Sequence, residues 1–306
     1  MKAEDAAMLD GLTTEASSGT SEGPAIDQLS VTDLVGRMNE RDATIAASVR
    51  AALPTISATV SAATERMREG GRLIYVGAGT SGRLGVLDAS EVPPTFGVED
   101  VVVGVIAGGP AALVSAAEGV EDDTDAGAAD LAALGVGPLD TVVGIASSGR
   151  TPYVLGALSH ATEAGALTVG LSCNIDTPLT RVATHGIEVP VGPEIVSGST
   201  RLGAGTATKM VLNILSTATM VQLGRTYGSL MVDMRAGNAK LRHRAVRMVI
   251  EATGADDETA TGALEATGWH AKPAIATILT GLSPAEAAQA LELAGGRLRT
   301  VIEERG

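Results

Sequence analysis

Aromatic side chains, cysteine and positive charge are all scarce in this chain of 306 residues. Phe, Trp and Tyr make up 2% of it, whereas 45% of the residues are hydrophobic and 38 are glycine. An interior of Ala, Val, Leu and Gly is typical of a parallel sheet closely covered by helices. The formal net charge is −14. A protein this acidic repels nucleic acid and anionic membranes, so we expect neither as a partner.

Cys173 is the only cysteine. An intrachain disulfide is therefore impossible, and a reducing cytoplasm is the expected compartment. Because Cys173 follows the apolar run Leu167–Leu171, a small buried residue explains it better than a nucleophile does. The four histidines show no metal-ligand spacing, so we expect no metal site.

Long uninterrupted apolar runs are also absent. Residues 204–223 are mostly apolar, but Lys209, Asn213 and Gln222 interrupt them, which predicts a buried helix rather than a membrane span. The N-terminus has no apolar segment of the kind found in signal peptides. Residues 1–25 are polar and rich in Ser and Gly, and we expect a mobile tail there.

Strand-like and helix-like segments alternate through the centre of the chain. Short apolar runs separated by helical stretches follow the pattern of βαβ units, so we expect an α/β fold: a five-stranded parallel sheet with helices on both faces. Residues 26–245 are expected to hold this sheet with its flanking helices, and residues 246–306 to form a small helical C-terminal domain. The expected strands are residues 72–77, 101–106, 141–146, 167–172 and 187–191.

Two of these strands end in similar loops. Residues 73–83 read LIYVGAGTSGR and residues 142–150 read VVGIASSGR, and a helical segment follows each. Backbone N–H groups and hydroxyls at a helix N-terminus hold an anion well, so the matched pair predicts one phosphorylated ligand between two strand ends. Two structural turns without a ligand remain an alternative. The candidate contacts are Gly79, Thr80, Ser81, Ser147, Ser148, Gly149 and Thr151.

The first loop also fits a rival motif, because residues 77–82 match the G-x-G-x-x-G fingerprint of dinucleotide sites. That interpretation needs a carboxylate at the end of the next strand to bind a ribose hydroxyl. The next expected strand, residues 101–106, runs into Ala-Gly-Gly without one. The hydroxyls of Thr80 and Ser81 suit a terminal phosphate better, so we favour the phosphate.

Carboxylates follow the first two expected strands. Glu91 stands just before Pro93 and Pro94, which we expect to end a helix, so its carboxylate is placed where helix gives way to loop. Residues 118–123 read EGVEDD and contain Glu121. From spacing alone, a solvated helix end is the simpler explanation of this second group.

Longer segments resemble the N-acetylmuramic acid 6-phosphate etherases, bacterial enzymes with a sugar isomerase (SIS) domain. The DASE-x-PPT and EG-x-ED segments are the most specific parts of this similarity. The resemblance implies an SIS-type three-layer sandwich, a homodimer, and catalytic carboxylates on Glu91 and Glu121. It extends from about residue 12 to the C-terminus and is also carried by residues 70–98, 144–158, 198–220 and 227–244.

The reaction implied by the resemblance removes the D-lactyl ether from C3 of the sugar and leaves N-acetylglucosamine 6-phosphate. A C3 ether lies β to the aldehyde of the open-chain sugar, so a base can take the C2 proton while an acid protonates the leaving oxygen. By family analogy Glu91 is the acid and Glu121 the base, and no metal or organic cofactor is needed. Ser199, with Glu194 and Arg201, is a further candidate for contact with the sugar.

The chain departs from the family pattern in two places. Gly203 stands where relatives commonly have a lysine, and residues 19–23 (GTSEG) stand where an Asn-containing segment is usual, so we expect neither to contribute to the site. Two other functions use similar loops: a non-catalytic sugar-phosphate regulator needs the loops alone, and an aldose–ketose isomerase needs them with one base. The presence of both Glu91 and Glu121 favours the etherase.

Overall fold

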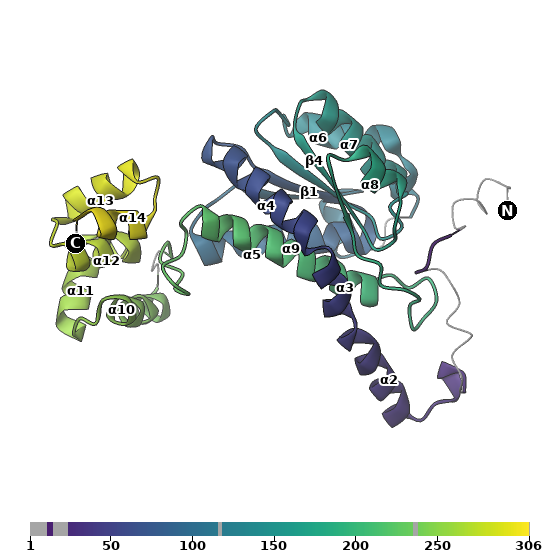
Figure 1. Ribbon diagram of the computed structural model, residues 1–306, viewed down its shortest axis with the longest axis horizontal. Helices are drawn as coiled ribbons and strands as arrows, with labels where there is room; N and C mark the ends of the chain where they lie inside the picture. The colour runs from purple at the N-terminus through teal and green to yellow at the C-terminus, as the bar shows by residue number, and fades with distance from the viewer. Residues whose placement is uncertain (1–10, 15–23, 116–117, 235–237, 306) are drawn as a thin grey trace. The chain divides into compact units, whose positions relative to one another are not determined.

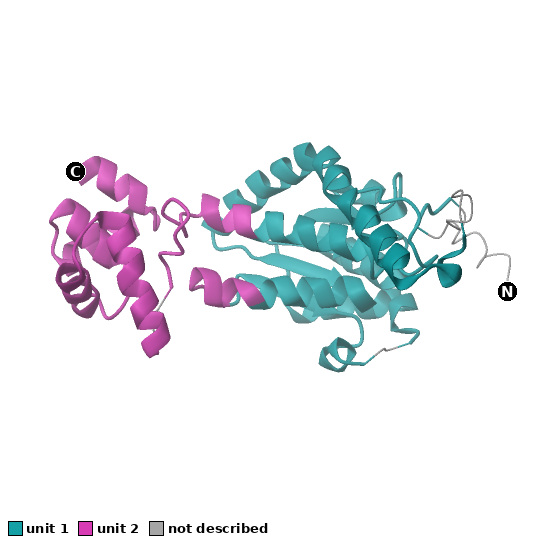
Figure 2. Cartoon of the chain, turned by 90° about the horizontal axis from the view of Figure 1, so that it is seen from below, with its two compact units in different colours: residues 1–90, 100–216 teal, residues 91–99, 217–306 magenta. Residues whose placement is uncertain are grey.

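The computed structural model divides into two compact units (Figure 2). The first contains residues 1–90 and 100–216, and the second contains residues 91–99 and 217–306. The domain borders expected at residues 25 and 245 remain predictions. The structure describes residues 11–14, 24–115, 118–234 and 238–305, so the expected mobile tail, residues 1–25, lies largely outside it.

The first unit is built on a sheet of five parallel strands in the order β2-β1-β3-β4-β5 (Figure 1). This confirms the predicted sheet. The strand order reverses between β1 and β3, which pair from Leu73 with Thr141 to Gly77 with Ile145. The strands are β1 (Leu73–Gly77), β2 (Val102–Ile106), β3 (Thr141–Ile145), β4 (Leu167–Ser172) and β5 (His185–Glu188).

The first four strands agree with the sequence prediction to within one residue, and the fifth does not. The prediction placed it at residues 187–191, but it begins at His185, opposite Val169 of β4. The pairing ends opposite Ser172, the last residue of β4, and Pro190 has no N–H with which to extend it. After Glu188, Val189 still donates from its N–H to the carbonyl of Ser172 (2.9 Å), and β4 has no further residue with which the apolar run can pair.

Helices cover both faces of the sheet, as predicted (Figure 1). On one face, Tyr75 donates a hydrogen bond from Oη to Asp88 of α5 (2.9 Å), and α4 and α9 lie on the same side. On the other face, Ile74 packs with Val154 and Leu158 of α7 in a buried cluster. The helices that start in the first unit are η1 (Ile26–Gln28), α2 (Val31–Ala43), α3 (Ile45–Ala51), α4 (Leu53–Arg68), α5 (Gly79–Phe96), η2 (Pro110–Leu113), η3 (Val120–Asp122), α6 (Thr124–Ala133), α7 (Pro152–Glu163), α8 (Pro178–Val182) and α9 (Gly203–Gln222).

Helix α5 continues through Pro93 and Pro94, whereas the sequence predicted that it ends before them. Each proline removes one N–H donor from the helix. The final turn is nevertheless held, because Thr95 donates from Oγ1 to the carbonyl of Glu91 (2.7 Å) and the N–H of Gly97 donates to that of Pro93 (2.9 Å). The predicted position of Glu91 at a junction of helix and loop is therefore wrong: Glu91 lies within the helix and is exposed.

Helices α6 and α7 approach each other backbone to backbone. A Cβ on Gly127 would lie 1.9 Å from the carbonyl oxygen of Tyr153, and one on Gly156 would lie 2.0 Å from that of Thr124. Only glycine fits at both contacts. The high glycine content thus has a direct structural use, and the contact holds α6 and the preceding η3 against α7.

The second unit contains short helices around an apolar core that includes Val249, Leu264 and Ile275. Lys272 is buried in it and donates from Nζ to Oδ2 of Asp233 (2.6 Å) and to two backbone carbonyls, so each of its three hydrogens has a partner. The predicted C-terminal helical appendage is confirmed. Its helices are α10 (Ala239–Thr253), α11 (Asp257–Ala266), α12 (Ala271–Thr280), α13 (Pro284–Leu293) and α14 (Leu298–Arg305).

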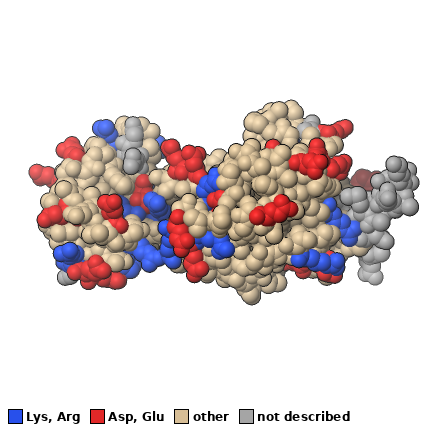
Figure 3. All heavy atoms as spheres, turned by 90° about the horizontal axis from the view of Figure 1, so that it is seen from above, with Lys and Arg blue, Asp and Glu red and all other residues tan. Residues whose placement is uncertain are grey.

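The apolar stretch at residues 204–223 is the helix α9, as predicted, and Val211 and Leu212 within it are fully buried. Within the described part of the chain, no single helix has both the length and the apolar composition to cross a membrane. One pair, residues 31–51 with 53–68, meets that test only when the two segments are joined across a bend of 59°. On the face seen in Figure 3, Lys and Arg side chains are scattered among Asp and Glu.

Candidate functional site

The loops that follow β1 and β3 meet at the carboxyl edge of the sheet. Helix α5 begins at Gly79, just after β1, and α7 begins at Pro152 after a short loop from β3. The N-termini of both helices border one pocket of about 310 Å³. Backbone N–H groups and the helix dipole favour an anion at such a place. The strand order also reverses here, which is the usual ligand position in open parallel sheets.

Most of the residues predicted to bind a ligand line this pocket. Gly149 and Ser199 do not, whereas Leu12, Asp122 and Thr200 do, and the sequence did not single these three out. The pocket therefore combines hydroxyls from both loops with two carboxylates, those of Glu121 and Asp122. The predicted residues that line it are Gly79, Thr80, Ser81, Glu121, Ser147, Ser148 and Thr151.

Gly149 supports the second loop from behind. Its φ is +65°, and a Cβ at this position would lie 2.2 Å from Oγ1 of Thr177, so only glycine fits. Its carbonyl accepts a hydrogen bond from the N–H of Leu179 (3.0 Å). The loop therefore rests on the turn between β4 and α8.

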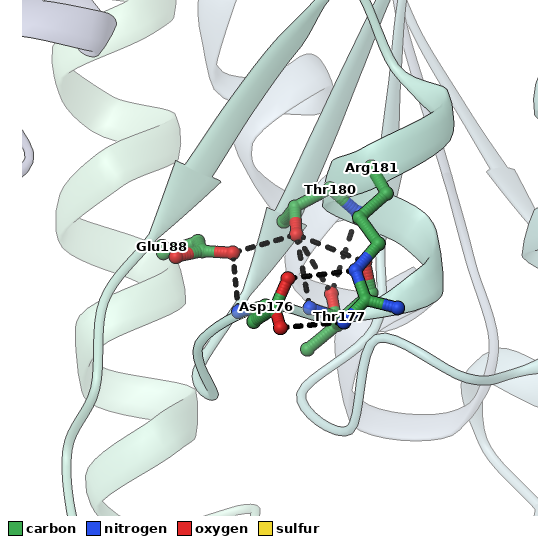
Figure 4. A network of polar contacts seen from close by, with 5 residues as sticks. All are labelled: Asp176, Thr177, Thr180, Arg181 and Glu188. Carbon is green, nitrogen blue, oxygen red and sulfur yellow. Dashed lines mark hydrogen bonds and ion pairs between the residues drawn. The ribbon is translucent and has the colours of Figure 1, made fainter.

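That turn is fixed by the polar network in Figure 4. Thr177 and Thr180 form a capping box at the start of α8. Glu188 of β5 accepts hydrogen bonds from Oγ1 of Thr180 (2.7 Å) and from the N–H of Asp176 (2.6 Å). Arg181 forms an ion pair with Asp176 on the same turn. Through Thr177, this network supports the backbone of the second loop.

Glu121 reaches the pocket from η3. The neighbouring Val120 packs against the buried cluster that contains α7, and this anchors an otherwise exposed acidic segment. A carboxylate repels an anion held by the two helix N-termini, so Glu121 is not suited to bind a phosphate. It is suited to act on a part of the ligand that extends beyond the phosphate.

Glu91 is not among the residues that line this pocket. It follows Ser81 by ten residues on α5, which places it about 15 Å further along the helix axis at about 1.5 Å per residue. Its side chain is exposed. Within a single chain, one predicted catalytic carboxylate is therefore at the pocket, and the other is ten residues along α5 from Ser81.

Glu194 has a structural role at the start of helix α9. It is fully buried and accepts hydrogen bonds from the N–H groups of Gly203 and Ala204 (both 2.9 Å), so it caps the N-terminus of α9. A Cβ on Gly203 would lie 3.1 Å from Oε2 of Glu194 and 3.2 Å from Nη2 of Arg41. A side chain at this position would crowd the cap. Arg201 lines a separate cavity of about 150 Å³ next to the same cap.

The N-terminal segment contributes to the pocket, contrary to expectation. Residues 19–23, which carry the departure from the family pattern, lie outside the described residues, but Leu12 from the same tail lines the pocket. The segment is held by Asn174, which lies 161 residues away from Thr13 in the sequence. Asn174 comes just after the carboxyl end of β4, a position where polar residues commonly contact ligands, and is recognisable in the sequence for that reason. Leu12 carries no comparable local signal.

Cys173 is a buried core residue, as its sequence context indicates. Its Sγ lies 3.5 Å from the carbonyl oxygen of Ala204 and 3.9 Å from Oγ1 of Thr208, both on α9. Over the described ranges, no group of three or more His, Cys, Asp and Glu side chains is arranged to hold a metal ion.

Known proteins share the fold and the sequence of this chain. Family models match for the glucokinase regulatory protein N-terminal SIS domain (residues 55–162), the SIS domain (residues 120–218) and a UBA-like domain (residues 245–279). A solved structure of a phosphoheptose isomerase from Francisella tularensis has a TM-score of 0.51 at 17% identity, covering 63% of this chain and 100% of that one. This likeness confirms the SIS-type fold.

Curated relatives match almost the whole chain. An N-acetylmuramic acid 6-phosphate etherase from Streptomyces avermitilis is 55% identical, with 97% of this chain and 95% of the relative covered. One from Mycolicibacterium smegmatis is 56% identical, with 90% of this chain and 93% of the relative covered. The chain belongs to the N-acetylmuramic acid 6-phosphate etherase family. The resemblance indicated by its motifs is thereby confirmed.

The burial of Cys173 leads to a testable prediction. Burial raises the pKa of its thiol to about 12, so at pH 8 only about one thiol in ten thousand is ionised and able to react. We expect a chromogenic disulfide reagent to modify the folded etherase very slowly at pH 8, and faster as the pH rises towards 12. Unfolding in guanidinium, the control, should release one rapidly reacting thiol per chain. Stoichiometric modification of the folded protein within seconds at pH 8 would contradict the burial argument.

Proposed function

We propose that the pocket between the two loops is the substrate site and that Glu121 is the base. As a member of its family, the chain is a carbon–oxygen lyase that cleaves the D-lactyl ether of N-acetylmuramic acid 6-phosphate in cell-wall recycling. One observation carries the placement of the site: Glu121 lines the same pocket as the hydroxyls of both loops. Phosphate bound at the helix N-termini leaves the sugar directed towards this carboxylate.

The pocket then supplies binding and proton transfer. Thr80 and Ser81 of the first loop and Ser147, Ser148 and Thr151 of the second donate hydrogen bonds to the phosphate, together with N–H groups at the starts of α5 and α7. Gly79 allows the backbone to approach it, Gly149 holds the second loop, and Ser199 contacts the sugar.

The reaction proceeds by elimination and then hydration. In the open-chain sugar, Glu121 takes the C2 proton, whose acidity comes from the neighbouring aldehyde. The C3–O bond breaks, and lactate leaves with a proton from an acid, which makes the C2–C3 double bond. Water then adds across this double bond: its hydroxyl group bonds to C3, and C2 regains a proton. Acid and base suffice for these steps, so no metal or organic cofactor takes part.

The acid is Glu91, supplied by a second copy of the chain. Glu91 is exposed, does not line the pocket of its own chain, and is about 15 Å along α5 from Ser81. A phosphate held at the first turn of α5 therefore lies far from the Glu91 of the same helix. A homodimer in which α5 of one copy reaches the pocket of the other brings both carboxylates to one substrate.

An exposed apolar face of helix α2 supports an assembly of two chains. None of the residues of α2 is buried, and Val31, Val35 and Met38 are 79%, 59% and 38% exposed. Their spacing of four and three residues places them on one face of the helix. An apolar face of this kind is stabilised when a second chain covers it. We place the enzyme in the cytoplasm, where the buried thiol of Cys173 stays reduced.

The activity is tested by incubating the purified protein with N-acetylmuramic acid 6-phosphate in a chelating buffer and measuring free D-lactate. Because elimination breaks the C3–O bond, reaction in ¹⁸O-water should place the label at C3 of the product sugar. Unlabelled product sugar with label in the lactate would mean that another bond is cleaved. A requirement for an added divalent ion would contradict a mechanism that uses only carboxylates.

The phosphate site is tested by Ser81→Ala and Ser148→Ala, one hydroxyl from each loop. Each variant loses a hydrogen bond to a charged group, worth about 1.5–3 kcal/mol, so we expect KM to rise by about tenfold or more with little change in thermal stability. Ser61→Ala is the matched control, because Ser61 is an exposed serine of helix α4 that donates to the carbonyl of Ser57 and does not line the pocket. If both loop variants have the KM of the wild type, the two-loop phosphate site is wrong.

The two glutamates are distinguished by the step at which their variants stop. Glu91→Gln should still exchange the C2 hydrogen with deuterated water, because that exchange needs only the base, while lactate release becomes very slow. Glu121→Gln should lose both. Exchange that survives in Glu121→Gln and is lost in Glu91→Gln would reverse the two roles.

Mixed dimers of these two variants test whether the acid comes from the partner. Half of the dimers from equal co-expression contain one chain of each kind, and each of these has one intact site if Glu91 acts across the dimer. Activity should then return to about a quarter of that of the wild type. Mixed dimers that stay inactive would place both carboxylates of a site in one chain.

A further inference from the structure

The N-terminal segment Leu12–Thr14 is built into the edge of the pocket. Leu12 is 5% exposed and lines the pocket, and Thr14 is fully buried. These residues belong to a tail whose composition predicts mobility, so their burial needs a specific cause. The polar contacts that hold them come from Asn174, just after β4, which is 2% exposed.

The carboxamide of Asn174 makes three hydrogen bonds to this segment and one to the loop at Ser147. Its Oδ1 accepts from the N–H of Thr13 (2.8 Å) and from Oγ1 of Thr13 (3.0 Å). Its Nδ2 donates to Oγ1 of Thr14 (3.2 Å) and to the carbonyl oxygen of Ser147 (2.8 Å). A carboxamide has two donor hydrogens and two acceptor positions, and all four are engaged. A buried polar group that is fully satisfied in this way is rigid.

The bond to Ser147 connects the segment to the phosphate-binding loop. The carbonyl of Ser147 also accepts from the N–H of Cys173 (3.1 Å) and from Oγ of Ser172 (3.3 Å), so this point of the loop is firmly held. The same side chain thus binds the two residues that follow Leu12 and the carbonyl of Ser147, and both Leu12 and Ser147 line the pocket. Asn174 therefore connects the segment of Leu12 directly to the loop of Ser147.

We propose that Leu12 is a specificity-determining contact for the sugar and that Asn174 is the positioning residue that places it. This inference rests on the proposed function of the pocket. The hydroxyls and helix N-termini of the pocket suit the phosphate, and Glu121 suits the reacting carbons. Leu12 offers an apolar side chain instead, and the substrate has apolar groups for it, the methyl groups of its N-acetyl and lactyl substituents. The contact is therefore to a methyl group of the substrate and not to its phosphate.

Leu12→Ala tests the contact. Removing methylene-sized contacts from a binding pocket changes recognition by roughly tenfold, so we expect KM for N-acetylmuramic acid 6-phosphate to rise by about that factor while kcat changes little. The inhibition constant of inorganic phosphate, which has no methyl group, should stay as in the wild type. Leu12→Met should restore KM. Ile175→Ala is the matched control, because Ile175 is next to Asn174 but is 62% exposed and does not line the pocket.

Asn174→Ala tests the positioning. It should raise KM at least as much as Leu12→Ala, and the double variant should be no worse than Asn174→Ala alone, because both changes remove the same contact. Independent, multiplying effects of the two changes would overturn the positioning role. A lowered thermal midpoint with wild-type KM in both single variants would show that the segment only stabilises the fold and would overturn the proposal.

The test of the Leu12 contact can be separated from the test of the etherase function. If the wild type releases D-lactate and Leu12→Ala has its KM, the inference fails while the etherase function stands. If the wild type releases no lactate, the function fails, and binding of N-acetylmuramic acid 6-phosphate itself, which carries both methyl groups and is then not consumed, decides the inference by calorimetry. Weaker binding by Leu12→Ala than by Ile175→Ala then supports the contact, and equal binding overturns it.

Discussion

The pairing of β1 with β3 is the constraint on which the site depends. Both strands are anchored where they start: Asp140 accepts hydrogen bonds from the N–H of Arg72 (3.0 Å) and from its guanidinium (2.7 Å), and Thr141 donates to the carbonyl of Arg72 (2.8 Å). Burial alone would raise the pKa of Asp140, but the hydrogen bonds from Arg72 and Gly137 hold it below its usual value, so the carboxylate stays charged. Two strands that start in register and have equal length end in register. Their loops therefore open on one pocket.

Features encoded by neighbouring residues could be predicted from the sequence. The strands follow from short apolar runs, and the helix starts follow from capping residues: Ser30 caps α2, and Ser283 forms a capping box with Glu286 at the start of α13. The position of the two hydroxyl loops follows from the rule that ligands bind at the carboxyl ends of parallel strands. Ser148 and Thr151 line the pocket for this reason.

Features that depend on distant contacts could not be predicted. Glu194 stands in a loop rich in small residues and resembles a ligand contact, but its carboxylate meets the start of α9 only in the folded chain. The segment at Leu12 has the composition of a mobile tail, and its burial depends on Asn174 at the end of β4. In each case the deciding partner is distant along the chain or is a backbone N–H group, and neither leaves a pattern in the local sequence.

Helix α5 carries two features that the proposed reaction requires, the turn at the pocket and the carboxylate of Glu91. Its first turn lies at the pocket and Glu91 lies ten residues later, so the helical rise sets their separation. A loop at Glu91, as Pro93 and Pro94 suggested, would leave the carboxylate free to move. In the structure the helix continues through these prolines, whose φ of about −65° is compatible with a helix, and ends beyond Glu91. In the proposed dimer, the same helix then carries the turn that borders one site and the acid of the other. A change in the geometry of α5 would consequently affect both sites at once.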